Sequence, residues 1–219
     1  MSDLRTRMDE ATAPNRLLEH PFYRAWSAGT LTRDDLAFYS TQYWRQVESF
    51  PAHLEDLTGR LEGDARAIVA ENLSDERDDD HPGLWLRFAE AVGADPEAVR
   101  SSVSEPETAA CVESFRSGMN DRSPAFALGM LYAYESQTPA VAETKVTGLR
   151  THYGIDGDAV TYFELHGELD VEHTDGLARA LGEVATTPEA QQDAVDGARA
   201  GAAAVWKILD GVARVREIC

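Results

Sequence analysis

The sequence predicts an all-α protein. Apolar residues recur at spacings of three and four through most of its length, which is the period of an amphipathic helix. Alternating apolar and polar residues bounded by hairpin turns, the pattern typical of strands, are not found. No internal repeat or long linker divides the 219 residues, so we expect a single domain over 1–219. Residues 1–14 precede the main apolar pattern and are expected to be a flexible or loosely packed N-terminus.

Local signals place the individual helices. Thr32 stands before two acidic residues at the start of a long apolar pattern, as expected of an N-cap. Pro51 falls inside that pattern and is expected to bend the helix without ending it. Pro124 suits the first position of another helix. We expect helices at about 15–29, 32–57, 63–76, 81–93, 105–118 and 123–152, one after 158 that carries residues 166–173, and a last one over about 187–212.

The composition excludes several classes of function. The net charge is −19, with 39 acidic residues against 20 Lys and Arg, so nucleic acid and anionic membranes are not expected partners. No apolar run is long enough to cross a membrane, and the N-terminus lacks the apolar core of a signal peptide. A cytoplasmic location is therefore expected. Two cysteines, Cys111 and Cys219, do not suggest a disulfide scaffold.

The cations are themselves unevenly chosen. Only Lys145 and Lys207 are lysines, and every other basic residue is arginine. Acid-rich, lysine-poor surfaces are typical of halophilic proteins, which work at molar salt, where the Debye length is only about 3 Å and repulsion among carboxylates is screened. We therefore expect the stability of this protein to depend on salt.

The most informative stretch is residues 166–173. On a helix, His166, Asp170 and His173 are spaced four and three residues apart and project from one face. Two imidazoles and a carboxylate on one face form a ligand set suited to iron, manganese or zinc. Taken alone, the same pattern also fits an acidic surface helix with solvated histidines.

Three further residues complete a possible ligand set. Glu135 sits among residues expected to face the core, where a carboxylate requires a cation or a paired charge; Arg150 or Lys145 could instead supply that charge. Glu76 and His81 flank a break between two helices, although an acidic run is usually a solvated face and a histidine before proline could simply cap a helix. Together the set could hold two metal ions inside a helical bundle.

The motifs resemble those of a known family. Glu19-His20-Pro21-Phe22-Tyr23 with Trp26 and Gly29 is similar to the start of the TenA/PqqC superfamily, which has the heme-oxygenase-like fold. The resemblance extends from about residue 15 to 215, and it is carried by three more motifs that are similar to the CADD-like branch of heme-oxygenase-like diiron oxidases. These are Glu76 with His81-x2-Leu84-Trp85, Tyr132-x-Tyr134-Glu135-Ser136-Gln137-x-Pro139, and His166-x3-Asp170-x2-His173.

The resemblance implies a fold, a ligand set and a reaction. The fold would be a heme-oxygenase-like bundle of about seven to eight helices, and the cofactor would be two metal ions, Fe/Fe or Fe/Mn. The loop after Glu76 is two residues shorter than the family's pattern, which leaves Asp75 and Asp78 as alternatives to Glu76. The implied metal ligands are Glu76, His81, Glu135, His166, Asp170 and His173.

Members of this branch make para-aminobenzoate for folate by oxidatively cutting one of their own tyrosines. The resemblance places the sacrificed tyrosine at Tyr23, accessory tyrosines at Tyr39 and Tyr134, and the essential lysine at Lys145. Lysine is notable in a chain that is nearly free of it, because the guanidinium of arginine cannot serve as an amine donor. The reaction would use O2 and an external electron donor, and the protein is expected to be a homodimer.

Other functions remain open. A diiron oxidase of the same fold could use the six ligands on an external amino acid, amine or fatty acid, without needing Tyr23 or Lys145. A cofactorless PqqC-like oxidase would not need this ligand set. A TenA-like thiaminase requires a nucleophilic cysteine in the bundle, where neither Cys111 nor Cys219 is expected. A binding protein without catalysis would leave the buried ligands unexplained.

Overall fold

The protein is a bundle of helices. The computed structural model describes residues 2–78 and 80–219, and within these ranges it contains helices, turns and loops without a strand. Short 3-10 turns lie at 13–15, 17–19 and 157–159, and one π-helical turn lies at 149–153. The all-α prediction is confirmed. The helices are α1 (Ser2–Thr12), α2 (Pro21–Ala28), α3 (Arg33–Thr58), α4 (Gly63–Asp78), α5 (His81–Ala91), α6 (Pro96–Arg100), α7 (Pro106–Asp121), α8 (Pro124–Glu135), α9 (Thr138–Gly148), α10 (Thr161–Val184) and α11 (Pro188–Arg216).

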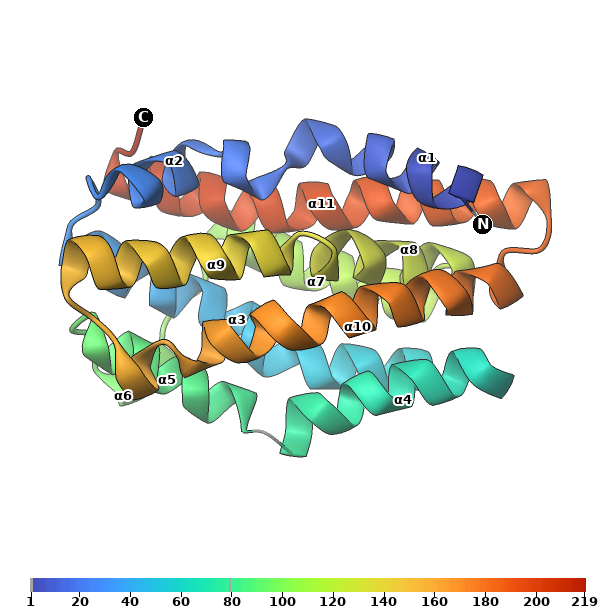
Figure 1. Cartoon of the computed structure of the whole chain (residues 1–219), viewed down its shortest axis with the longest axis horizontal. Coiled ribbons are helices and arrows are strands. Elements are labelled where there is room, and N and C mark those ends of the chain that lie inside the picture. Colours follow the sequence, from blue (N-terminus) through green and yellow to red (C-terminus); the bar gives the residue numbers. More distant parts are fainter. Residues whose placement is uncertain (1, 79) are drawn as a thin grey trace.

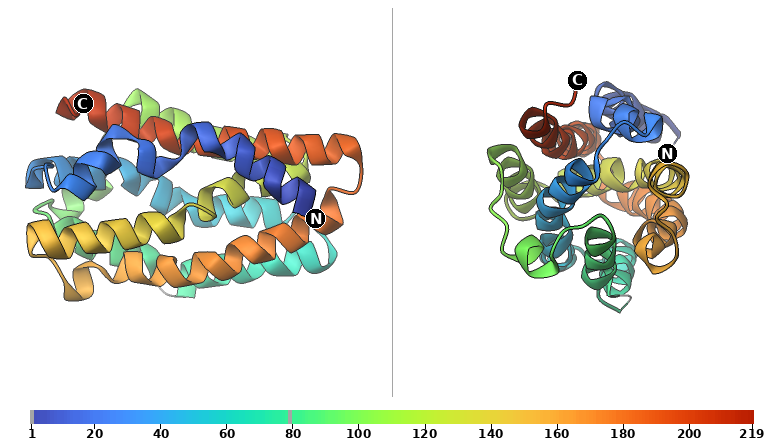
Figure 2. Two further views of the ribbon diagram at one scale, coloured as in Figure 1. Left: turned by 45° about the horizontal axis from the view of Figure 1, so that its top comes forward. Right: turned by 90° about the vertical axis from the view of Figure 1, so that its left-hand side faces the viewer.

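The longer helices run along the long axis of the molecule (Figure 1). Helix α11 packs on α8, α7 and α1, while α10 packs on α9, α8 and α4. Helix α3 contacts α4, α5 and α7. Seen from its end, the bundle has its helices arranged around a common interior (Figure 2). The buried apolar side chains of these helices form one hydrophobic core.

Helix α8 lies in the middle of this packing. Every residue from Ala125 to Glu135 is buried, as expected for a helix that is apolar on all sides. Its backbone approaches that of α11 closely, since a Cβ added at Gly197 would lie only 2.0 Å from the carbonyl oxygen of Phe126. A Cβ at Gly129 would lie 2.1 Å from the carbonyl oxygen of Ala194. Glycine is therefore required on both helices, and α8 carries Glu135 deep into the bundle.

Several predicted helix boundaries are confirmed. Thr32 caps α3 in a capping box, in which its hydroxyl accepts from the backbone N–H of Asp35 and the Asp35 carboxylate accepts from the N–H of Thr32. Pro51 lies inside α3, which continues to Thr58 as expected. Pro124 is the first residue of α8.

One predicted helix is wrong. The sequence suggested a continuous helix over about 123–152, whereas the structure breaks it at Ser136 and Gln137 into α8 and α9. Pro139 explains the break, because proline has no N–H to donate to the carbonyl of Glu135 and its ring would clash with that carbonyl. The break places Glu135 at the C-terminal end of α8. The short helix α6 was also not anticipated.

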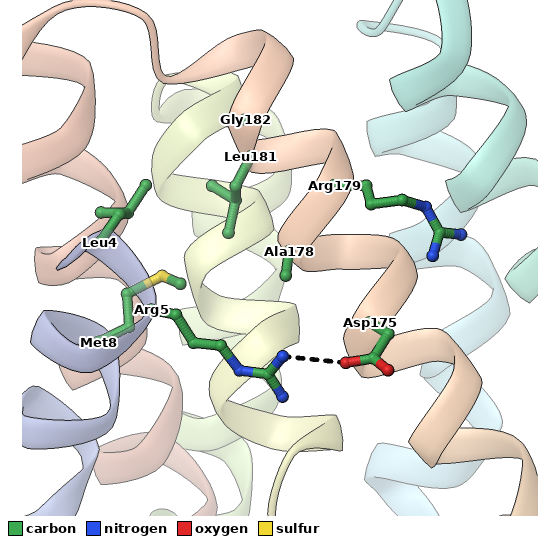
Figure 3. Close-up of a pocket in the computed structure, with 8 residues that line it drawn as sticks. All are labelled: Leu4, Arg5, Met8, Asp175, Ala178, Arg179, Leu181 and Gly182. Carbon is green, nitrogen blue, oxygen red and sulfur yellow. Dashed lines mark hydrogen bonds and ion pairs between the residues drawn. The ribbon is translucent and has the colours of Figure 1, made fainter. Parts of the chain in front are cut away.

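The N-terminus also differs from the expectation of a loosely packed segment. Residues 2–12 form α1, whose Leu4, Met8 and Ala11 share one face and are buried. The helix packs against α11 and bounds a groove of about 410 Å³ next to α10. Figure 3 shows Arg5 spanning this groove to Asp175, with 2.9 Å between Nη1 and Oδ1. Three apolar residues at helical spacing are sufficient to dock the segment.

The helices are too short or too polar to cross a membrane. Among residues 2–78 and 80–219, no helix combines sufficient length with sufficient hydropathy for a transmembrane span.

Candidate metal centre

Three predicted ligands meet in the interior of the bundle. Glu76 comes from the last turns of α4, His81 is the first residue of α5, and His166 lies in α10. One ligand atom from each lies within 4.8 Å of the others, the only such group of three among the residues that the structure describes. The Oε2 atom of Glu76 is 2.8 Å from Nδ1 of His81, and its Oε1 is 3.6 Å from Nε2 of His166. All three side chains are buried.

The structure distinguishes the three acids near the α4 break. Glu76 is 6% exposed and contacts both histidines. Asp75 faces a different histidine, with its Oδ2 3.0 Å from Nε2 of His173. Asp78 is exposed and accepts a hydrogen bond from the Ser74 hydroxyl. Of these acids, Glu76 therefore has the geometry of a ligand in the three-residue group.

The remaining three predicted ligands lie beside this group. Asp170 Oδ1 is 3.5 Å from Nδ1 of His173 on the same helix. Glu135, 1% exposed, accepts a hydrogen bond of 2.6 Å from Asn72 Nδ2, while its second oxygen has no partner. The charges of Asp170, His173 and Glu76 all act on the Glu135 carboxyl. The six predicted ligands thus form one electrostatically connected cluster contributed by α4, α5, α8 and α10.

The pKa values of this cluster reflect burial and crowded charge. Burial opposes ionisation of Glu76, but the adjacent His166 and His81 outweigh it and lower the Glu76 pKa to about 2. Burial, together with the charge of Asp170, raises the Glu135 pKa to about 8. Burial lowers the His173 pKa, but Asp170, Glu135 and Asp75 raise it more, to about 9. The crowded carboxylates therefore require positive charge in their midst, which protons or a metal ion can supply.

Unpartnered buried atoms fit a metal. The Nδ1 atom of His166 lies 2.7 Å from the carbonyl oxygen of Tyr162, and because a carbonyl only accepts, Nδ1 carries a proton, which leaves Nε2 as the nitrogen that can ligate a metal. This arrangement is typical of metal-bound histidine. The Nε2 atom of His81 and Oε2 of Glu135 are buried and have no hydrogen-bond partner within the described ranges 2–78 and 80–219. Carboxylates and imidazoles in this ratio suit iron or manganese.

The predicted lysine and tyrosines lie together next to this centre. Lys145 in α9 is 4% exposed, and its Nζ is 5.7 Å from the ring centroid of Tyr23 and 5.3 Å from that of Tyr39. The hydroxyls of Tyr23 and Tyr39 are 3.4 Å apart. The ring of Phe163 lies 4.7 Å from Nζ. Burial in this aromatic enclosure lowers the Lys145 pKa to about 7, so a substantial share of the amine is neutral and nucleophilic near neutral pH.

A small cavity joins the lysine to the metal centre. It has a volume of about 20 Å³ and is lined by Lys145, His166 and Tyr134 among others. Tyr134 accepts a 3.1 Å hydrogen bond from the Tyr43 hydroxyl, and Tyr43 also lines the cavity. A space of this size accommodates about one water-sized molecule.

Three residues of the site were not identified from the sequence. Tyr162 lies under His166 with ring centroids 4.1 Å apart, and Tyr43 lies in the wall of the small cavity. Asn72 bonds to Glu135. Each residue stands four positions from a predicted one, since Tyr162 precedes His166, Asn72 precedes Glu76 and Tyr43 follows Tyr39. The spacing of four along a helix was the signal that could have revealed them.

Comparison with known proteins shows which family this chain belongs to. Residues 37–206 match the family of iron-containing redox enzymes. A 4-aminobenzoate synthase of Nitrosomonas europaea is 33% identical over 94% of this chain and 89% of its own length. A 4-aminobenzoate synthase of Chlamydia muridarum is also 33% identical, over 76% of this chain and 72% of its own.

The fold has a counterpart among solved structures. A domain with a heme oxygenase-like fold from Shewanella denitrificans superimposes with a TM-score of 0.81 at 20% identity, covering 99% of this chain and 91% of that one. The heme-oxygenase-like fold and the family resemblance inferred from the motifs are both confirmed. The chain belongs to the family of iron-containing redox enzymes and is a metal-dependent oxidoreductase.

Proposed function

We propose that this protein makes 4-aminobenzoate, which is para-aminobenzoate, from its own Tyr23 in a single O2-dependent turnover. The reaction would take place beside two metal ions, Fe/Fe or Fe/Mn, held by Glu76, His81, Glu135, His166, Asp170 and His173. Two relatives that are 33% identical carry the name 4-aminobenzoate synthase, which supports the product. The proposal that the substrate is a residue of the protein itself rests on the geometry of the site.

The size of the inner cavity is the observation that carries the proposal. Cavities that bind small-molecule substrates usually measure about 300–1,000 Å³. The cavity between Lys145 and His166 measures about 20 Å³. It could receive a molecule the size of O2, but not an amino acid or a fatty acid. A substrate that is already part of the protein does not need to enter.

The aromatic residues around Lys145 supply such a substrate. Tyr23 is 2% exposed, and its phenol contacts only the interior of the bundle and the Tyr39 hydroxyl. Burial raises the pKa of the Tyr23 phenol, so the ring remains protonated and protected from water before it reacts. The ring would supply the six carbons of the aromatic product, and the neutral Lys145 amine, held 5.7 Å from the ring, would supply or direct the nitrogen.

The metal pair would supply the one-electron chemistry by which O2 oxidises a phenol. The role of the chain is to hold the reacting groups and to keep water out. The ring of Tyr162 packs against His166 with 4.1 Å between ring centroids, and Tyr43 and Tyr134, which share a hydrogen bond, both line the cavity next to Lys145 and His166. An external reductant would be needed to prepare the metals.

The main alternative is an oxidase of the same fold that acts on an external molecule. It would require a larger space beside the metal ligands. A groove of about 820 Å³ does exist between α9 and α10, but it is separated from the small cavity by Ala142 and Phe163, which line both. The alternative would therefore require these helices to separate.

An isotope experiment distinguishes the two functions. Protein is produced with ring-¹³C tyrosine, loaded with iron and manganese, reduced and exposed to O2 in the presence of unlabelled tyrosine. We expect ¹³C-labelled 4-aminobenzoate, at most one molecule per chain, and a loss of mass at Tyr23. Producing the protein with ¹⁵N-lysine then tests whether the nitrogen originates from Lys145.

Two variants serve as the critical test and its control. Tyr23→Phe should abolish the product without changing the metal content, because Tyr23 is not a metal ligand. Tyr153→Phe should make product like the unaltered protein, because Tyr153 lies in the π-helical turn after α9, outside the residues that line the inner cavity. Unlabelled product, or O2 consumption without 4-aminobenzoate, would refute the internal substrate.

A further inference from the structure

A second, polar cavity opens on the other side of the metal centre. It lies between α4 and α10, has a volume of about 190 Å³ and is distinct from the aromatic cavity next to Lys145. Six polar or charged residues line it: Glu71, Asn72, Asp75, Glu172, His173 and Arg179. The cavity therefore connects the protein surface with two residues of the candidate centre, His173 and the Asn72 partner of Glu135.

The inner end of this cavity has unused ligand capacity. Asn72 is 2% exposed, and its Nδ2 donates to Glu135, while its Oδ1 has no hydrogen-bond partner among the residues that the structure describes. A buried amide oxygen without a partner is unfavourable unless it binds a donor or a cation. Beside it, Asp75 accepts from His173 at 3.0 Å. Amide and carboxylate oxygens are the ligands that hard divalent cations prefer.

The outer end carries acidic charge. Glu71 and Glu172 are exposed and face each other from α4 and α10 across the cavity, and neither forms an ion pair with the residues that the structure describes. With Asp75 they place three carboxylates in the cavity, alongside the guanidinium of Arg179 and the imidazole of His173. Clefts lined by one sign of charge raise the local concentration of the opposite ion and its association rate by about 10- to 1,000-fold.

The other approach to the metal centre is unsuited to cations. The aromatic cavity is closed by Phe163 and Ala142 and holds the amine of Lys145, which repels a positive ion when it is protonated. A metal ion on that side would have to pass an apolar wall without ligands. The polar cavity instead provides oxygen atoms from its rim to its inner end.

We propose that the cavity between α4 and α10 is a divalent-cation entry site, in which Glu71 and Glu172 capture the ion and Asp75 and Asn72 pass it to the metal centre. This inference rests on the metal centre of the proposed function. It assigns the loading of the centre to the polar cavity between α4 and α10, and not to the aromatic cavity next to Lys145.

The test measures how fast metal-free protein takes up Co²⁺, followed by the visible absorption of the bound ion. The variant E71Q/E172Q removes the two rim carboxylates. The matched control E143Q/E168Q removes two exposed, unpaired acids that line the groove between α9 and α10. Both variants change the net charge equally. The experiment uses the lowest KCl concentration at which circular dichroism shows folded protein, and is repeated at molar KCl.

We expect E71Q/E172Q to take up Co²⁺ about tenfold more slowly than the unaltered protein at low salt, with the same final stoichiometry. The control should match the unaltered protein, and molar salt should reduce the difference. Equal uptake rates for both variants would overturn the entry site, as would a loss of bound metal in E71Q/E172Q. If the unaltered protein bound no metal at all, the metal centre of the proposed function would fail instead.

Discussion

The amine of Lys145 faces the ring of Tyr23 inside the bundle, with 5.7 Å between Nζ and the ring centroid. The two residues come from α9 and α2, which pack against each other. No carboxylate contributes to the lowered pKa of Lys145, which is caused by burial alone. The protein thus keeps an ammonium group where an apolar residue would be more stable, which is expected of a group retained for chemistry.

This placement predicts a pH-dependent gain of stability for Lys145→Met. The Lys145 pKa is about 7 in the folded protein and 10.5 in the unfolded chain, so between these pH values the unfolded chain binds more protons and stability rises with pH. The unfavourable burial of the charge is complete below pH 7 and disappears above about pH 10.5. Lys145→Met should therefore raise the free energy of unfolding by a few kcal/mol below pH 7 and have little effect above pH 10.5.

Urea unfolding from pH 6 to pH 10 measures this difference. Lys207→Met is the control for the removal of a lysine, because Lys207 is exposed on the surface of the protein. A gain for Lys145→Met that is constant with pH would show that Lys145 remains charged in the folded state. The same variant should make no 4-aminobenzoate.

The contacts of Glu76 predict which of the acidic residues near the break between α4 and α5 binds metal. Glu76→Gln should lower the metal content by at least one ion per chain, because it removes the carboxylate that contacts both His81 and His166. Asp78→Asn should leave the content unchanged, because Asp78 is exposed and bonds only to Ser74. Metal analysis after anaerobic loading with Fe²⁺ and desalting provides the measurement. Equal loss in both variants would point to the acidic run as a whole.

The sequence predicted the parts of this site that depend on local order. The capping box of Thr32 and the shared face of His166, Asp170 and His173 follow from spacing within a single helix, and the structure reproduces both arrangements. The break after Glu135 was also local, but the apolar pattern continued through it and concealed the effect of Pro139.

The parts of the site that the sequence did not predict depend on which faces of different helices pack together. Asp75 and Glu76 are adjacent and differ by about 100° around α4, so composition could not choose between them. The buried face of α4 consists of Ala65, Val69, Asn72 and Glu76. Asn72 and Glu76 are polar, so the sequence did not identify them as core residues. The aromatic enclosure of Lys145 combines residues from α2, α3, α5 and α10, and no motif within one segment could reveal it.

The packing of α1 predicts that the N-terminus contributes to stability. Met8 is 1% exposed in the contact of α1 with the bundle, so Met8→Ala should lower the free energy of unfolding by about 2–5 kcal/mol. Arg5→Ala breaks the ion pair between Arg5 and Asp175, in which both side chains are about half exposed. It should lower the free energy of unfolding by about 1 kcal/mol at most. Urea unfolding compares the two variants, and metal content should be unchanged in both. Similar small effects would mean that α1 is loosely attached in solution.

The net charge of −19 predicts that salt stabilises the folded protein. The acidic residues are concentrated on the surface, where folding brings them closer together than in the unfolded chain, and their repulsion decreases as the Debye length falls from about 10 Å at 0.1 M salt to about 3 Å at 1 M. The melting temperature should therefore rise steadily with KCl over this range. It should rise much less near the isoelectric pH of the protein, where protonated carboxyl groups no longer repel one another. A melting temperature that is independent of KCl at neutral pH would show that the surface carboxylates are far enough apart, or sufficiently paired with arginine, to need no screening.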